Sequence, residues 1–152
     1  MRAVVQRVHW AKVSVSGTIV GQIEQGLLVY LGVRSGDTAE TVAWIARKIA
    51  GLRIFPNQNG RFDRSVRDVN GSVLVVSQFT LYGDASHGYR PDFTAAAPPA
   101  EAEPLYQLFI SKLRNEYGLP VQTGVFGAMM DVECANWGPV TIILEKESSL
   151  PQ

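Results

Sequence analysis

The sequence has a single cysteine, Cys134, and only two histidines, His9 and His87, among its 152 residues. One cysteine excludes an intramolecular disulfide, so nothing points to an oxidising compartment and we expect a cytoplasmic protein. Neither histidine belongs to a His-x-x-x-His or Cys-x-x-Cys spacing, so we expect no metal and no cofactor. The sequence also lacks a Gly-x-Ser-x-Gly motif and a glycine-rich phosphate loop.

Long apolar runs and an excess of one charge are missing too. No run approaches the roughly 18 residues of a membrane span, and residues 1–8 lack the apolar core of a signal peptide. Fourteen basic residues balance fourteen acidic ones. Proteins that contact many phosphates usually carry a basic excess, so any contact with nucleic acid should be local. With 46% apolar residues, we expect one folded domain over 1–152.

Most of the chain has the pattern of strands. Alternating or continuous apolar residues, separated by turn residues, predict about eight of them. The run 27–33 and the run 73–76 are continuously apolar, which predicts strands buried on both faces. The remaining strands are expected around 4–8, 13–15, 19–24, 121–126, 129–134 and 140–146. A turn is expected at Gly17-Thr18.

Two segments have helical patterns. Val42, Ile45, Ala46 and Ile49 form one apolar stripe, preceded by Asp37 and Glu40 at capping-box spacing. A second helix is predicted over roughly 100–117, ending at Gly118. Residues 56–71 read as a surface loop or loose hairpin, and 147–152 as a frayed tail. These patterns predict an α+β fold: a strongly curved, mostly antiparallel sheet or barrel with two packed helices.

Ser77-Gln78-Phe79-Thr80 is the most unusual segment, because polar side chains follow directly on four aliphatic residues. Burying an unpaired hydroxyl or amide costs a few kcal/mol, so these groups are satisfied internally or face a cavity. A strand end whose hydroxyls bond the neighbouring backbone explains the segment equally well.

Asn136-Trp137-Gly138-Pro139-Val140-Thr141 is the second candidate. Gly-Pro between two strands is most often a turn, and the sequence does not decide between a cis and a trans bond. Cys134 lies in an alternating strand and reads as a small hydrophobic residue more than as a nucleophile.

Taken together, the two segments resemble the D-aminoacyl-tRNA deacylase family, whose signatures are Ser-Gln-Phe-Thr and Gly-Pro. The resemblance spans nearly the whole chain and omits only 57–70 and the last half-dozen residues. Its further matches are Arg2-Ala3-Val4-Val5-Gln6-Arg7-Val8, Leu52-Arg53-Ile54-Phe55, Arg90-Pro91-x-Phe93, Ala97-Pro98-Pro99 and Thr123-Gly124-x-Phe126-Gly127-Ala128.

The resemblance implies a homodimer with each active site at the subunit interface. The Gly138-Pro139 segment of one chain, cis in the family, reaches the pocket formed by residues 77–80 of the other, and Arg7 holds it. Phe126 and Ala102 are the matched candidates for the walls of a slot for the terminal adenosine of tRNA. Thr141 follows the Gly-Pro segment and is grouped with it in substrate binding.

The implied reaction is hydrolysis of the ester that joins a D-amino acid to tRNA. Main-chain atoms at Gly138-Pro139 leave no room for an L side chain, whereas glycine, including glycine mischarged on tRNA-Ala, fits. The N–H of Phe79, with that of Thr80, stabilises the oxyanion, and Gln78 positions the ester. Two mechanisms are open. In the first, Thr80 is a covalent nucleophile; in the second, water attacks with assistance from the substrate's 2′-hydroxyl and Thr80 does not react. The second is favoured, because no base accompanies the threonine.

Two departures from the family pattern are Trp137 and Met129, where many relatives carry acidic residues. They cast doubt on any polar contact carried over to those positions. Two other functions remain open: a non-catalytic protein that binds RNA ends on the same scaffold, and a small-molecule esterase that uses Ser77 or Thr80 with His87 as base. Arg7 argues against a related branch of the family with the opposite Gly-Pro geometry.

Overall fold

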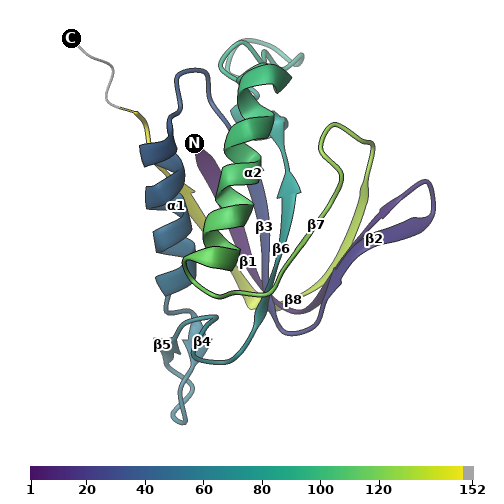
Figure 1. Cartoon of the computed structure of the whole chain (residues 1–152). Coiled ribbons are helices and arrows are strands. Elements are labelled where there is room, and N and C mark those ends of the chain that lie inside the picture. Colours follow the sequence, from purple (N-terminus) through teal and green to yellow (C-terminus); the bar gives the residue numbers. More distant parts are fainter. Residues whose placement is uncertain (149–152) are drawn as a thin grey trace.

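The computed structural model describes residues 1–148 and shows one strongly curved sheet with two helices packed on one face (Figure 1). Its strands are β1 (Arg2–Val15), β2 (Thr18–Ile23), β3 (Gly26–Gly32), β4 (Phe55–Pro56), β5 (Phe62–Arg64), β6 (Ser72–Ser77), β7 (Val121–Thr123) and β8 (Asp131–Glu145). The helices are α1 (Ala39–Gly51), the 3₁₀ helix η1 (Phe79–Tyr82) and α2 (Pro99–Asn115). None of these helices is long and apolar enough to cross a membrane. The predicted α+β fold is confirmed.

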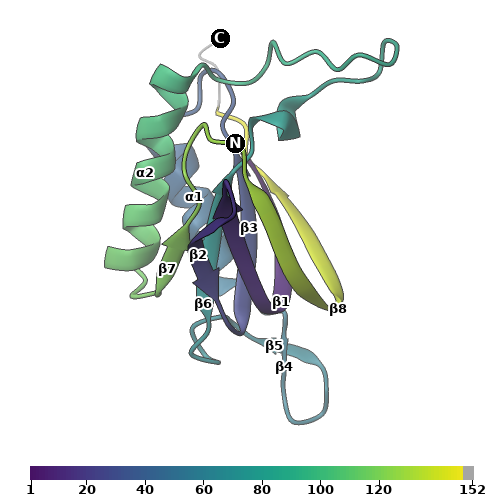
Figure 2. The same ribbon diagram turned by 90° about the vertical axis from the view of Figure 1, so that its right-hand side faces the viewer.

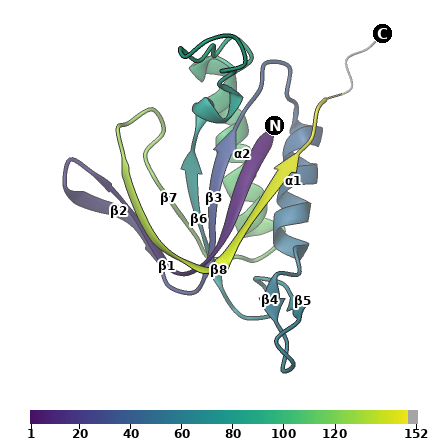
Figure 3. The same cartoon turned by 180° about the vertical axis from the view of Figure 1, so that it is seen from behind.

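The sheet bends because its two longest strands bend together. β1 pairs with β8 along one edge, and on its other edge with β3 over its first half and with β2 over its second half. Figure 3 shows β1 and β8 turning at the same level. The strand order is β2-β1-β3-β6-β7, with β8 beside β1. The short strands expected at 4–8 and 13–15 are therefore one continuous strand.

A glycine brings the two ends of the sheet together. A Cβ placed on Gly21 of β2 would lie 2.5 Å from the carbonyl oxygen of Thr123 in β7. Only a residue without a side chain allows β2 to approach β7 this closely. The sheet is therefore almost closed into a barrel.

The sheet is antiparallel around β1, whereas β6 runs parallel to both β3 and β7. Parallel neighbours need crossover connections. Helix α1 lies in the connection from β3 to β6, and α2 lies in the connection from β6 to β7. Both crossovers place their helix on the same face of the sheet, as Figure 2 shows.

The continuous apolar runs are buried on both faces, as predicted. In β3, Leu27, Val29 and Leu31 pack against the helices, whereas Leu28 faces the interior of the curved sheet. In β6 the odd and even positions divide in the same way: Val73 and Val75 face the helices, and Leu74 and Val76 face the interior. The protein therefore has two cores separated by one layer of strands.

Helix α1 buries its predicted stripe of Val42, Ile45, Ala46 and Ile49. Its capping box is formed by Thr38 and Thr41, one residue later than the expected pair of Asp37 and Glu40. Asp37 does not cap the helix, because its carboxylate accepts hydrogen bonds from the α-ammonium of Met1 at 2.8 Å and from the N–H of Arg34 at 2.7 Å.

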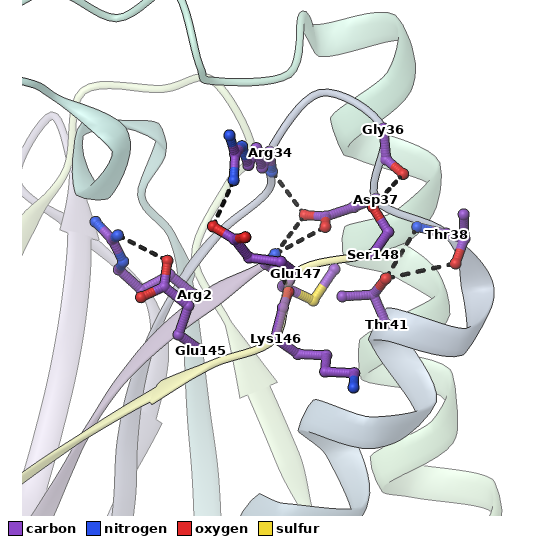
Figure 4. A network of polar contacts seen from close by, with 11 residues as sticks. Arg2, Arg34, Gly36, Asp37, Thr38, Thr41, Glu145, Lys146, Glu147 and Ser148 are labelled. Atoms are coloured by element: carbon purple, nitrogen blue, oxygen red, sulfur yellow. Dashed lines mark hydrogen bonds and ion pairs between the residues drawn. The ribbon is translucent and has the colours of Figure 1, made fainter. Parts of the chain in front are cut away.

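The Met1 ammonium binds Asp37, which Figure 4 shows within a network of polar contacts. The ammonium also donates to the carbonyl of Lys146 at 2.8 Å, and the side chains of Met1 and Asp37 are almost completely buried. Burial lowers the pKa of this amine. Of the tail expected to fray, Glu147 pairs with Arg34 and Ser148 donates to Gly36, and 149–152 lie outside the described residues. The network joins the start of β1 to the end of β8 and to the start of α1.

Residues 56–71 form the predicted loose hairpin. β4 and β5 pair antiparallel and project beyond the end of α1 (Figure 1). Helix α2 begins at Pro99, close to the expected start near residue 100, and Pro104 falls in its second turn.

Candidate active site

A pocket of about 830 Å³ opens where β6 ends and α2 begins. All four residues of Ser77-Gln78-Phe79-Thr80 line it, so the segment faces a cavity. The rest of the lining is almost entirely apolar and comes from β3, α2, the segment before α2 and the segment before β8. These residues include Leu31, Val33, Phe93, Ala97, Ala102, Tyr106, Phe126, Met129 and Met130.

The backbone turns sharply at this point. The last ladder bond of β6 is donated by the N–H of Gln78 to the carbonyl of Leu31, at 2.8 Å. Phe79 and Thr80 then begin η1, and the first N–H groups of a helix have no acceptor within it. Among residues 1–148, neither N–H donates to a backbone carbonyl outside helices and strands. The segment therefore offers two free backbone donors at the pocket.

The side chains of the segment bind each other. The amide Nε2 of Gln78 donates to the hydroxyl Oγ1 of Thr80. The residues that line the pocket include no histidine, lysine, arginine, aspartate or glutamate. In the described part of the chain, the Thr80 hydroxyl thus lies at a pocket with donors but no base.

The two other candidate nucleophile or base residues lie elsewhere. His87 is exposed in the loop before α2 and does not line the pocket. Cys134 lies in β8, 3.9 Å from the amide oxygen of Gln6, and burial raises the pKa of its thiol. The structure therefore does not bring His87 to Ser77 or Thr80, which removes the arrangement that the esterase alternative requires.

Phe126 and Ala102, the two residues expected to form the walls of an adenosine slot, line the same pocket. Ala102 lies in the first turns of α2 and is nearly buried. Tyr106, one turn later, packs its ring 5.6 Å from the ring of Phe126. Burial raises the pKa of Tyr106 to about 12. Sequence reasoning missed Tyr106, although its spacing of four residues from Ala102 places it on the same helical face.

The predicted turn at Gly138-Pro139 is wrong. The two residues lie inside β8, where Gln6 pairs with Thr141 and Val8 pairs with Asn136. Four residues, 137–140, therefore oppose Arg7 alone, which makes a wide bulge. The bulge contains the cis Gly138-Pro139 bond. Both halves of β8 pair with β1, so long-range pairing joins what local sequence divides into two strands.

Arg7 holds the bulge. Its Nε donates to the carbonyl of Trp137 at 3.0 Å, and its Nη1 donates to the carbonyl of Ile54 at 2.7 Å. The guanidinium also lies 4.1 Å from the centre of a Trp137 ring. Only 6% of Arg7 is exposed, and burial lowers its pKa. Trp137, the departure from the family pattern, thus fills the space over the arginine.

Asn136 and Thr141 close the bulge from its two ends. The Asn136 side-chain carbonyl accepts from the N–H of Val140 at 2.9 Å, and its amide donates to Thr141 Oγ1 at 3.1 Å. Gln6 also donates to Thr141, at 3.3 Å. Sequence reasoning assigned no role to Asn136, and its Asn-x-x-x-Val spacing gave no signal for this contact.

Within one chain the two signature segments do not meet. Leu31 pairs with both Ala3 and Ser77, so Ser77 lies level with Ala3 across the sheet. The bulge lies opposite Arg7, four residues further along β1, or about 13 Å away along the strand. Neither Gly138 nor Pro139 lines the pocket.

Among residues 1–148, no group of three or more histidine, cysteine, aspartate or glutamate side chains is arranged to hold a metal ion. The pocket offers backbone N–H groups, one side-chain amide, the hydroxyls of Ser77, Thr80 and Tyr106, and an apolar wall. This arrangement suits the stabilisation of a developing oxyanion next to a bound apolar or aromatic group.

Comparisons with known proteins agree with this description. A D-aminoacyl-tRNA deacylase of Exiguobacterium sibiricum is 56% identical over 146 residues, which cover 96% of this chain and all of that protein. One of Acaryochloris marina is 53% identical over 148 residues, covering 97% of each. A solved structure of a protein named c-Myc DNA Unwinding Element Binding Protein is 41% identical, with a TM-score of 0.91, and covers 97% of this chain and all of that one. Residues 4–145 match the sequence profile described as D-Tyr-tRNA(Tyr) deacylase, and the chain therefore belongs to this deacylase family.

Proposed function

We propose that the protein hydrolyses the ester bond of D-aminoacyl-tRNA and releases the free amino acid and tRNA. The observation that carries the proposal is the pocket at residues 77–80, where two free backbone donors face a largely apolar cavity. The names of the curated relatives, at 53% and 56% identity over nearly the whole chain, support the same reaction.

The working unit of the proposal is a homodimer. The pocket of one chain lacks Gly138 and Pro139, although the family signature contains them. A second copy supplies them in the proposed arrangement. Two large apolar side chains at the pocket support its being covered by a second copy of the chain: Met129 is 91% exposed and Phe79 is 58% exposed. Exposed apolar groups of this size are typical of surfaces that bind another protein.

Chirality is then read by main-chain atoms. The bulge presents its backbone rigidly, since Arg7 and Asn136 bind its carbonyl and N–H groups. In the proposed dimer this wall accepts the α-amino group and excludes an L side chain, so correctly charged tRNA is spared. Glycine has no side chain to exclude, so glycyl-tRNA, including glycine mischarged on tRNA-Ala, is also a proposed substrate.

Catalysis in this proposal depends on the backbone. The N–H groups of Phe79 and Thr80 stabilise the oxyanion of the tetrahedral intermediate, and Gln78 positions the ester. Thr80 lacks a base among the residues that line the pocket, and a hydroxyl without a base is a weak nucleophile. Water therefore attacks, assisted by the 2′-hydroxyl of the terminal ribose. Phe126, Ala102 and Tyr106 enclose the adenine.

The direct test compares D-Tyr-tRNA, L-Tyr-tRNA and a simple aryl ester. Turnover of the D-charged tRNA alone is the expected result. Hydrolysis of the aryl ester without chiral preference would favour the esterase, which the position of His87 already disfavours.

A second candidate function is a non-catalytic protein that binds the end of a nucleic acid. It is favoured by the name of the structural relative, c-Myc DNA Unwinding Element Binding Protein, at 41% identity. Binding of both D- and L-charged tRNA without turnover of either would establish this function in place of the deacylase.

A further inference from the structure

The charges of the chain are balanced overall but are separated along it. Residues 47–68 contain six basic and two acidic residues, a net charge of +4, and the other 130 residues carry eight basic and twelve acidic ones, a net charge of −4. This segment comprises the end of α1 and the β4–β5 hairpin. The basic residues are Arg47, Lys48, Arg53, Arg61, Arg64 and Arg67, and we call the surface that they form the basic end. All six are exposed.

Most of these charges are not neutralised by the fold. Among residues 1–148, the only ion pair of the basic end joins Arg53 to Asp63. The second acidic residue, Asp68, binds the N–H of Ser65 at 2.8 Å. Lys48 lies in the last turn of α1, where a cation interacts favourably with the helix dipole. The dipole gives no reason for the arginines of the hairpin.

The basic end is also hollowed. A depression of about 590 Å³ lies between the end of α1 and the hairpin, and its polar lining consists of Arg53, Arg67, Ser65 and one carboxylate, that of Asp68. Guanidinium and hydroxyl groups in such a hollow match the geometry of phosphate oxygens.

The position of the basic end relates it to the signature bulge. One guanidinium, that of Arg7, binds both the carbonyl of Ile54, directly before β4, and the carbonyl of Trp137, directly before Gly138. The ring of Phe62 in β5 lies 5.5 Å from the same guanidinium. The hairpin projects past the bend of β8 in Figure 3. The hairpin and the bulge are thus held side by side.

We propose that the basic end binds the sugar–phosphate backbone of the tRNA acceptor arm. This inference rests on the proposed deacylase function and adds the surface along which the RNA runs. Because the bulge of one chain enters the partner's pocket in that proposal, the basic end of the same chain lies beside the partner's pocket. RNA that leaves the pocket passes over it, so each tRNA contacts both subunits.

The test compares two substrates that share the ester but differ in phosphates: D-Tyr-tRNA and the 3′-D-tyrosyl ester of adenosine. In the Arg61→Gln/Arg67→Gln variant we expect KM for D-Tyr-tRNA to rise about five- to tenfold with kcat nearly unchanged. The slope of log(kcat/KM) against log salt concentration should fall by about 1 to 2, one for each lost phosphate contact. Hydrolysis of the adenosine ester should stay at the wild-type rate.

Two controls accompany the variant. Lys12→Gln removes a charge of the same sign from the second half of β1, where Lys12 pairs with Glu133, and should change neither substrate's KM. Arg61→Lys keeps the charge and should keep the wild-type KM for D-Tyr-tRNA. If the double variant hydrolyses neither substrate, it is misfolded. The KM for D-Tyr-tRNA of the single variants Arg61→Gln and Arg67→Gln then tests the inference in its place.

An unchanged KM and salt slope in the double variant, with active wild-type protein, would overturn the inference. If wild-type protein hydrolyses neither substrate, the proposed function itself fails, and this is seen without any variant. The two failures are therefore distinguishable.

Discussion

Thr80 presents a hydroxyl at the pocket that accepts a hydrogen bond from Gln78 and has no base beside it. If water is the nucleophile, Thr80→Ala lowers kcat by less than about tenfold. Removal of a covalent nucleophile costs several orders of magnitude. Single-turnover hydrolysis of D-Tyr-tRNA measures the difference, and loss of nearly all turnover in a folded variant would establish Thr80 as the nucleophile.

Arg7 satisfies two carbonyl groups and packs on Trp137 while almost completely buried. Arg7→Met keeps much of the volume but leaves both carbonyls without their donor, so we expect the free energy of unfolding to fall by about 2 to 4 kcal/mol. Urea unfolding measures this loss. The matched Arg34→Met, which removes an exposed ion pair to Glu147, should cost less than about 1 kcal/mol.

At the scale of single residues, the sequence singled out residues that the fold brings to one pocket, but not the geometry of that pocket. The polar segment after β6 and the two wall residues, Phe126 and Ala102, line one pocket. Tyr106, Phe93 and Met130 line it too, but each is an apolar or aromatic residue whose local pattern is that of ordinary core. Only the folded chain shows which apolar residues border a cavity.

The secondary-structure elements meet most tightly where β2 approaches β7. Gly21→Ala places a methyl group 2.5 Å from the carbonyl oxygen of Thr123, and β2 can accommodate it only by moving away. We expect the free energy of unfolding to fall by about 1 to 3 kcal/mol. Gly51→Ala is the matched control, because nothing lies within 4 Å of a Cβ at the end of α1. It should be neutral or stabilising by about 0.5 kcal/mol, and equal losses in the two variants would contradict the closure of the sheet.

The junction of β1, β8 and α1 gives stability a pH dependence. Burial lowers the pKa of the Met1 amine below its usual value of 8.0, so between the two values the unfolded chain binds more protons. The free energy of unfolding therefore rises with pH through the window below 8.0 and levels off above it. One glycine added before Met1 takes the amine out of this site and should abolish that contribution. Urea unfolding of both proteins over this window measures it, and identical slopes would refute the assignment.

The sequence predicted which segments form helices and strands better than it predicted the residues at which they begin and end. The apolar runs of β3 and β6 and the stripe of α1 follow from periodicity alone. The cap of α1 moved to Thr38 because Asp37 binds the Met1 ammonium, 36 residues away in sequence. Similarly, Gly138-Pro139 reads locally as a turn but lies in a bulge, because both flanking segments pair with β1. Contacts between distant residues decided both cases.

For the whole molecule, the separation of pocket and bulge makes a quantitative prediction about mixed dimers. Ala102→Phe fills the slot of the pocket, and Pro139→Ala alters the bulge, so each variant alone should lose nearly all activity. In the proposed homodimer, mixing the two variants in equal amounts with exchange of subunits gives half heterodimers, each with one intact pocket facing one intact bulge. We expect about one quarter of wild-type activity to return.

The hydrolysis of D-Tyr-tRNA by the re-annealed mixture measures this recovery. Mixtures kept under conditions in which subunits do not exchange serve as the control. No recovery after proven exchange would mean that pocket and bulge act within one chain, and full activity of Ala102→Phe alone would remove Ala102 from the slot.

The pairing of β1 with β8 has a consequence for the synthesis of the protein on the ribosome. β1 is made first, but the strand that covers one of its edges ends at Glu145, and the Met1 ammonium binds Lys146. At roughly 5–20 residues per second, synthesis separates the two strands by on the order of 10 s. During that time a 14-residue strand rich in valine has an unpaired edge, which is a template for aggregation. The nascent chain therefore needs protection until its last strand emerges, and its yield in cells should depend on chaperones that bind exposed strands more than the stability of the finished fold suggests.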